Sequence, residues 1–150
     1  MLIDVLTQLY ERDIAKLRTE IEMYASDADI WKTAGEVPNS GGNLCLHLCG
    51  NLRHFIGFVL GGSGYVRDRD LEFSDTNVSR DELFMRIDAT LEEVKAGLAK
   101  LSADDLEKEY PIDVFGHPMT TGWFITHLAT HFNYHLGQLN YHRRLIAACG

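Results

Sequence analysis

The sequence is poor in positive charge: its 150 residues include 14 lysines and arginines against 22 aspartates and glutamates, a formal net charge of −8. Nucleic acids and anionic membranes are bound through clustered positive charge, so this balance argues against both as main partners. The chain also lacks any apolar run near the roughly 18 residues that a membrane span needs. Its first residues lack the basic stretch, apolar core and cleavage site of a secretory signal, so we expect a cytoplasmic protein.

Cysteine is scarce as well. Three cysteines cannot all pair, and Cys45 and Cys49 lie one helical turn apart, which argues against a disulfide framework. We expect these two side chains to be small buried residues rather than thiolate ligands or nucleophiles. The sequence contains no Glu-x-x-His, HExxH, P-loop or CxxC pattern, which argues against carboxylate-rich di-iron bundles, zinc proteases, P-loop proteins and thioredoxin-like redox proteins.

Strand signals are nearly absent, whereas apolar residues recur at gaps of three and four along most of the chain. A hydrophobic content of 45% and a charged content of 24% are typical of a folded globular protein, and this length suffices for one core. We therefore predict a single all-α domain over residues 1–150, a four-helix bundle. The predicted helices cover about residues 3–24, 44–60, 79–101 and 121–147, the third opened by a capping box of Ser79 and Glu82. A short turn at 102–108 and an extended segment at 110–119 precede the last helix.

The connection between the second and third helices is long, running from residue 61 to residue 78. Two antiparallel neighbours joined at the same end need far fewer residues. Fully extended, such a segment reaches on the order of 60 Å, whereas the second helix spans only about 25 Å. The connection can therefore cross the whole bundle and start the third helix parallel to the second, and we favour this crossed topology over a simple up-and-down bundle.

Histidine is frequent: four of the seven histidines lie between residues 127 and 142. On a helix, His131 and His135 fall in the middle of the apolar stripe, and His142 falls there too. Side chains four residues apart point the same way about 6 Å apart, which lets both imidazoles reach one metal ion. The alternative is a structural pair, hydrogen-bonded to core carbonyls or linked through water. A third ligand from the second helix is either His47 or His54, because the two lie about 10 Å apart along the axis.

Two segments carry a resemblance to a known family: Asn-Leu-Cys-Leu-His-Leu-Cys-Gly-Asn-Leu-Arg at 43–53 and His-Phe-Asn-Tyr-His-Leu-Gly-Gln at 131–138. Together they resemble the DinB superfamily, the DinB/YfiT-like metal-binding four-helix bundles, over essentially the whole chain. The resemblance implies crossed up-down-down-up connectivity, homodimers, and a divalent metal held by three histidines, here His47, His131 and His135. Many relatives carry His-Arg-Gly-Gln after the last ligand, whereas this chain has Leu136 in place of that arginine. Residues 65–73 resemble a less characterised branch of the superfamily.

The resemblance also implies a function. Characterised relatives resemble thiol S-transferases, in which a low-molecular-weight thiol binds the metal and attacks an electrophile. Three neutral ligands leave a coordination position open, as at catalytic metal sites. We therefore expect a metal-dependent transferase that joins a cellular thiol to a small electrophile, with zinc or nickel, or else iron or manganese, as the metal. The alternatives are a non-catalytic metal-binding stress or sensor module and a metal-assisted hydrolase.

Four further polar residues are candidates for contacts with the substrate or with the metal ligands: Asn51, Gln138, Arg67 and Arg69. The first follows His47 by one turn, and the second follows His135 by three residues. The two arginines can meet carboxylates of a thiol if the long connection folds over the site. Otherwise they belong to a solvated loop that pairs with its own aspartates.

The crossed topology selects His47 as the third ligand. A metal between His131 and His135 lies about 12 residues into the fourth helix. If the second helix runs antiparallel to the fourth, the same count back from its end leads to about position 48, next to His47. A parallel second helix would bring His54 to that level instead. His127 lies about 40° further from the stripe centre than His131, and we expect it not to bind.

One face of the second helix is rich in small residues; it carries Leu46, Gly50, Arg53 and Gly57. A glycine inside a helix costs about 1 kcal/mol relative to alanine, so a packing reason is expected. We predict that this face lies against another backbone, either the long connection or a partner subunit.

Overall fold

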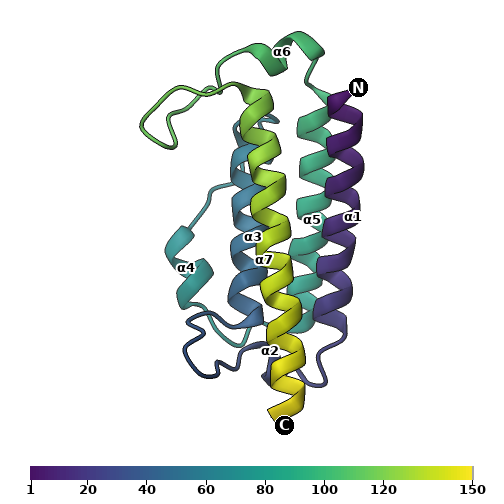
Figure 1. The fold of residues 1–150 in the computed structure, drawn as a ribbon, viewed down its shortest axis with the longest axis vertical. Helices are drawn as coiled ribbons and strands as arrows, with labels where there is room; N and C mark the ends of the chain where they lie inside the picture. The colour runs from purple at the N-terminus through teal and green to yellow at the C-terminus, as the bar shows by residue number, and fades with distance from the viewer. Residues whose placement is uncertain (150) are drawn as a thin grey trace.

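The computed structural model describes residues 1–149, and its regular elements are helices (Figure 1). Four long rods lie side by side: α1 (Leu2–Glu22), α3 (Gly41–Leu52) with its π-helical continuation η1 (Arg53–Phe58), α5 (Arg80–Ala99) and α7 (Thr121–Cys149). Three short helices lie in the connections: α2 (Asp27–Ile30), α4 (Arg69–Ser74) and α6 (Ala103–Glu107). The described residues form no β-strand, only an isolated bridge between Glu109 and Thr120. The prediction of an all-α fold is confirmed.

α1 and α7 are parallel neighbours. Near their starts, the Tyr10 hydroxyl donates to the carbonyl oxygen of Ile125 at 2.5 Å. Near their ends, Arg143 donates to the Glu20 carboxylate at 2.7 Å. The two helices therefore run the same way along the bundle, and the ends of the chain lie at opposite ends of the molecule (Figure 1).

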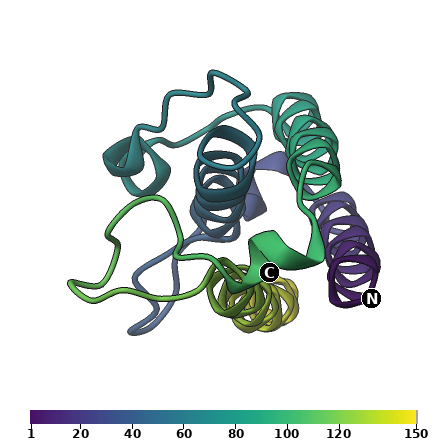
Figure 2. The same ribbon diagram turned by 90° about the horizontal axis from the view of Figure 1, so that it is seen from above.

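α3 runs in the opposite direction to α7. Gly41, at the start of α3, lies against His142 near the end of α7, while the ring of Phe55 packs on that of Phe124 near its start, with centroids 5.1 Å apart. α5 is parallel to α3, because Gly97 near its end packs on the end of η1. The four rods lie side by side in the view along the bundle (Figure 2), and they have the crossed up-down-down-up connectivity that the long connection predicts (Figure 1).

α3 begins three residues before its predicted start. The Ser40 hydroxyl accepts the backbone N–H of Asn43 at 3.1 Å, and this cap opens the helix at Gly41. Gly41 is the first residue of the helix and does not belong to a turn. A side chain at this position would collide with the Tyr24 ring. The glycine therefore serves close packing at the base of the bundle.

Serine caps open α5 and α6 as well. Ser79 accepts the N–H of Glu82 at 3.1 Å as predicted, but the Glu82 carboxylate accepts from Arg86 (3.1 Å) instead of completing a capping box. The complete box opens α6, where the Ser102 hydroxyl and the Asp105 carboxylate each accept a backbone N–H of the other residue. The segment predicted as a turn at 102–108 is therefore a short helix.

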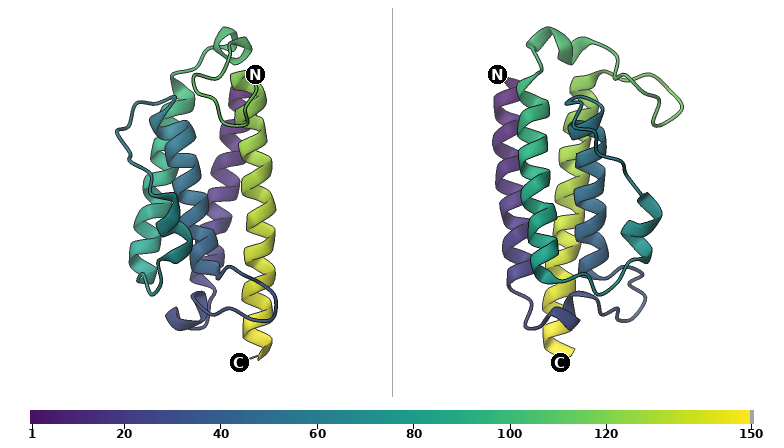
Figure 3. Two further views of the ribbon diagram at one scale, coloured as in Figure 1. Left: turned by 90° about the vertical axis from the view of Figure 1, so that its left-hand side faces the viewer. Right: turned by 180° about the vertical axis from the view of Figure 1, so that it is seen from behind.

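The long connection crosses the bundle beside α3 and carries α4 (Figure 3). The Asn43 side chain donates to the carbonyl oxygen of Glu72 at 3.0 Å, which ties α4 to the start of α3. A Cβ on Gly50 would collide with the Glu72 carboxylate, and one on Gly57 would meet Glu93 of α5. The small-residue face of α3 thus packs against the long connection, the first of the two predicted options, and against α5.

His142 is a structural residue within the apolar stripe of α7. It is buried, and both of its ring nitrogens have partners: Nδ1 lies 2.6 Å from the Tyr24 hydroxyl and Nε2 lies 2.7 Å from the carbonyl oxygen of Lys32. These bonds fasten the end of α7 to the segment between α1 and α3. Among residues 1–149, no helix combines the length and the apolar character needed to cross a membrane.

Candidate metal centre

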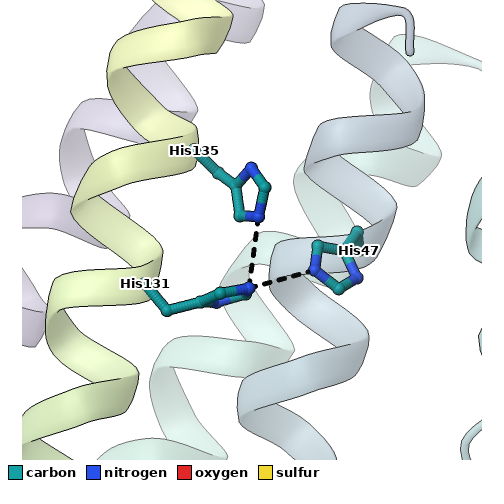
Figure 4. A group of neighbouring side chains, drawn as sticks. All are labelled: His47, His131 and His135. Carbon is teal, nitrogen blue, oxygen red and sulfur yellow. Dashed lines mark hydrogen bonds between the residues drawn. The ribbon is translucent and has the colours of Figure 1, made fainter. Parts of the chain in front are cut away.

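Three histidines from two helices converge between α3 and α7 (Figure 4). The four-residue spacing places His131 and His135 on one face of α7, and antiparallel α3 brings His47 to their level. Nε2 of His131 lies 3.3 Å from Nε2 of His47 and 3.1 Å from Nε2 of His135. Nitrogens at a zinc–nitrogen distance of about 2.0–2.1 Å lie about 3.4 Å apart in a tetrahedron. These two separations, and the approach of all three ligand atoms to within 4.8 Å of one another, are compatible with three ligands around one ion, with a fourth position open.

The outer nitrogens of two of these rings are bonded so that the inner ones are free to coordinate. Nδ1 of His47 donates to Oε1 of Glu72 at 3.0 Å, and Nδ1 of His135 donates to Oε1 of Gln138 at 2.7 Å. A proton on Nδ1 leaves the Nε2 lone pair available, and such partners fix the orientation of a metal-binding ring. Gln138, one of the candidate residues from the sequence, thus contacts the ring of His135 and is not among the residues that line the neighbouring cavity.

The two histidines of α7 are held in the neutral form, the form in which an imidazole can bind a metal ion. Burial, together with the nearby imidazoles of His135 and His47, lowers the pKa of His131 to about 4. Burial also lowers the pKa of His135, against the hydrogen bond with Gln138. At neutral pH these rings therefore carry no proton that a metal ion would have to displace.

Glu72 is the buried carboxylate behind the cluster. Burial raises its pKa, but the hydrogen bonds from His47 and Arg67 outweigh burial and lower the pKa overall. Arg67 approaches as a fork, with Nε 2.8 Å from Oε2 and a terminal nitrogen 2.9 Å from Oε1. The long connection thus supplies an ionised carboxylate to the Nδ1 side of His47. The sequence assigned no role to Glu72, because nothing in its spacing shows that α4 packs against α3.

A cavity of about 590 Å³ opens from the three histidines. α4 and the loop that precedes α7 lie on the same side of the bundle as this cavity and contribute part of its wall (Figures 1 and 2). Asn51, Arg67 and Arg69 line it, so the connection does fold over the site. The side-chain oxygen of Asn51 is buried and has no hydrogen-bond partner within the described chain.

His54 and His127 stand outside the cluster. The ring of His54 stacks on Phe58, with centroids 6.0 Å apart. His127 lines the cavity, but its ring stacks on Trp123 at 5.1 Å and nearly parallel to it. In residues 1–149, His47, His131 and His135 are the one group of candidate metal ligands whose ligand atoms all lie within 4.8 Å of one another.

The cysteines lie away from the histidine cluster. Cys45 and Cys49 are buried free thiols. Cys149 is exposed at the end of α7. None of the three belongs to the group of side chains that can hold a metal ion in residues 1–149.

Comparison with known proteins agrees with this architecture. A crystal structure of a DinB-like protein from Bacillus cereus ATCC 10987 superposes with a TM-score of 0.73 at 16% identity, covering 95% of this chain and 91% of that one. The protein therefore has the all-α DinB-like fold. Residues 4–148 match the family described as "Protein of unknown function (DUF1572)", and the chain belongs to that family. No curated protein matches the sequence significantly.

Proposed function

We propose that this protein binds a divalent metal ion through His47, His131 and His135 and catalyses transfer of a low-molecular-weight thiol to a small electrophile. The observation that carries the proposal is the convergence of three imidazole Nε2 atoms at the wall of a cavity. When bound, the ion would favour the thiolate form of a thiol at the open position and so make it nucleophilic. Imidazole ligands suit zinc or nickel best, with iron and manganese as alternatives.

Two other residues of the chain would orient the histidine ligands of this centre. Glu72 and Gln138 hold the Nδ1 protons of His47 and His135, which directs both Nε2 atoms inward. Arg69 and Asn51 line the cavity, where they can contact a substrate. In the reaction the thiol loses its proton to solvent, its sulfur forms a bond to the electrophilic carbon, and the leaving group departs with its bonding electrons.

The environment of the carboxylates favours a thiol over water as the nucleophile. Hydrolysis at a metal centre is commonly assisted by a carboxylate that accepts a proton from the bound water. None of the described residues that line the cavity is an aspartate or a glutamate. Glu72, next to the cluster, is already engaged by His47 and Arg67. A thiol bound to the ion needs no such base at neutral pH.

Two measurements test the proposal. Metal content is determined on protein purified without a nickel column, and the expected result is about one divalent ion per chain. The metal-loaded protein is then incubated with several biological thiols and a chromogenic electrophile. We expect conjugate formation that depends on the metal and is lost in His131→Ala. Metal binding without turnover would support the non-catalytic module instead, and hydrolysis of an ester substrate would support the hydrolase.

We also propose that the protein forms a homodimer. In support, α7 exposes large apolar side chains, among them Tyr134, Tyr141 and Leu145. Light scattering on the purified protein is expected to give twice the chain mass of 17.0 kDa. A mass of one chain at micromolar concentration would contradict the proposal.

A further inference from the structure

Basic and acidic side chains are unevenly distributed around the cavity beside the histidines. Its lining includes Arg67, Arg69 and four histidines, and among the described residues that line it there is no acidic side chain. The whole chain carries a formal charge of −8. A second cavity of about 360 Å³ is lined by four carboxylates and two arginines, so its charges of both signs can balance one another. The cavity beside the histidines has arginines but no carboxylate among its described lining residues, which suits it to an anion.

Of the two arginines, Arg69 is the one available to a ligand. Arg67 is already neutralised by both oxygens of Glu72. Arg69 forms no ion pair within residues 1–149; its guanidinium lies 5.2 Å above the centroid of the Phe73 ring. That ring lies 4.9 Å from the ring of His47. The available cation and one histidine of the cluster are therefore both neighbours of the Phe73 ring.

Asn51 provides a second, independent sign of a ligand. The residue is only 7% exposed, and its side-chain oxygen has no partner in the described structure. A buried acceptor without a hydrogen bond is costly, so it marks a place where a bound molecule can donate one. Asn51 lines the same cavity, one helical turn beyond His47.

The rest of the wall is apolar and aromatic. Phe55 packs on Phe124 at 5.1 Å, and Phe115 of the loop before α7 packs on Phe124 at 5.9 Å. Together with Phe73 and Leu128, these side chains form flat surfaces between the two polar groups of the wall. Such surfaces bind a planar or aliphatic body and exclude water from it.

We propose that this cavity binds a small carboxylic acid with an apolar body. The carboxylate is bound by Arg69, the body lies against the phenylalanines, and an N–H or O–H group donates to the side-chain oxygen of Asn51. One guanidinium matches the two oxygens of one carboxylate, and its single positive charge balances the single charge of a carboxylate rather than the nearly double charge of a phosphate. Binding of this acid does not depend on the proposed function, but its role as a substrate does. In the proposed reaction, the substrate class is a thiol or an electrophile that carries a carboxylate.

Calorimetric titration with three related probes tests the proposal: 3-phenylpropionate, its neutral amide 3-phenylpropionamide, and phenyl phosphate. Each is titrated into the protein as purified and again after removal of metal by a chelator. We expect the carboxylate to bind about tenfold or more tightly than the amide in both states, because an ionic hydrogen bond is lost in the amide. Phenyl phosphate should not exceed the carboxylate.

Two variants locate the carboxylate. Arg69→Gln should abolish the preference for the acid over the amide. Arg144→Gln is the matched control, because Arg144 also lies over an aromatic ring, 5.4 Å from Tyr141, but away from the cavity. This control should bind like the unchanged protein. Asn51→Asp, which places a negative charge in the wall, should bind the amide but reject the acid.

The outcomes of these experiments distinguish the carboxylate-binding proposal from the proposal that the histidines bind a metal ion. Carboxylate binding that survives chelation but is lost in Arg69→Gln supports the inference even if no metal-dependent transfer is found. Binding seen only with metal and unchanged in Arg69→Gln would show that the carboxylate is merely a metal ligand, and would overturn it. Equal affinity for acid and amide, or tighter binding of phenyl phosphate, would also overturn it.

Discussion

Glu72 links the histidine cluster to the long connection through one buried carboxylate, which accepts from both His47 and Arg67. We predict that Glu72→Gln lowers metal affinity about 10- to 100-fold, because a partner of this kind orients a metal-binding imidazole and makes it more basic. The measurement is competition with a chromogenic chelator. Glu93→Gln serves as the control, since Glu93 forms a comparable fork with Arg53 at 2.9 Å but lies away from the histidines. Equal affinities of the two variants would contradict the role of Glu72.

A second prediction at the residue scale concerns the three proposed metal ligands. His47→Ala, His131→Ala and His135→Ala should each abolish tight metal binding, because two imidazoles from one chain do not hold a divalent ion firmly. His54→Ala and His127→Ala should retain it, since these rings stack on Phe58 and Trp123. Metal content after dialysis distinguishes the five proteins. Loss of metal from His54→Ala together with retention by His47→Ala would contradict the ligand choice.

At the scale of the elements, α3 depends on the close approach of α4. We predict that Gly50→Ala destabilises the protein by about 1–3 kcal/mol, because the added Cβ collides with the Glu72 carboxylate and forces it aside. The same change at Gly137 is the control: that helical glycine has no atom within 4 Å of an added Cβ, so alanine should raise stability by up to about 1 kcal/mol. Urea unfolding of both variants gives the two values. A neutral Gly50→Ala would show that α4 is not held against α3.

The long helices could be predicted from sequence, whereas the short ones could not. α1, α5 and α7 each repeat buried residues over about four turns or more, so their periodicity is unambiguous. α2, α4 and α6 have four to six residues, too few for a period to show. The start of α3 was missed because Gly41 and Gly42 are typical of a turn. In the structure they make room for Tyr24 and Trp31, a tertiary reason that no local pattern contains.

In the candidate site, too, sequence patterns predict some contacts, whereas others depend on tertiary packing. The pairing of His131 with His135 follows from helical spacing, and the length of the long connection indicated that α3 would bring His47 beside them. The contact of Glu72 with His47 depends on how α4 packs, and the fork from Arg67 depends on a turn within the connection. Such contacts join segments that share no periodic pattern, so the sequence carried no local signal for them.

At the scale of the whole molecule, the half-buried His131 makes stability depend on pH. The pKa of His131 is lowered from 6.5 to about 4, so over this interval the unfolded chain binds more protons than the folded one. Stability of the metal-free protein should therefore be full above pH 6.5 and fall as the pH drops toward 4. His131→Gln should show a shallower fall in thermal melts across that range. Identical slopes for the two proteins would contradict the burial of a neutral His131.

The parallel arrangement of α1 and α7 has a mechanical consequence. Leu2 and Cys149 lie at opposite ends of the bundle, on helices that contact each other directly (Figure 1). A tensile force applied between these ends slides one helix along the other, so contacts such as that of Tyr10 with Ile125 are loaded together. In an up-and-down bundle, whose ends lie on the same side, the same force peels the helices apart one turn at a time. Crossed connectivity thus places the bundle in a shear geometry, and in single-molecule stretching we expect it to yield at a higher force than an up-and-down bundle with helices of equal length.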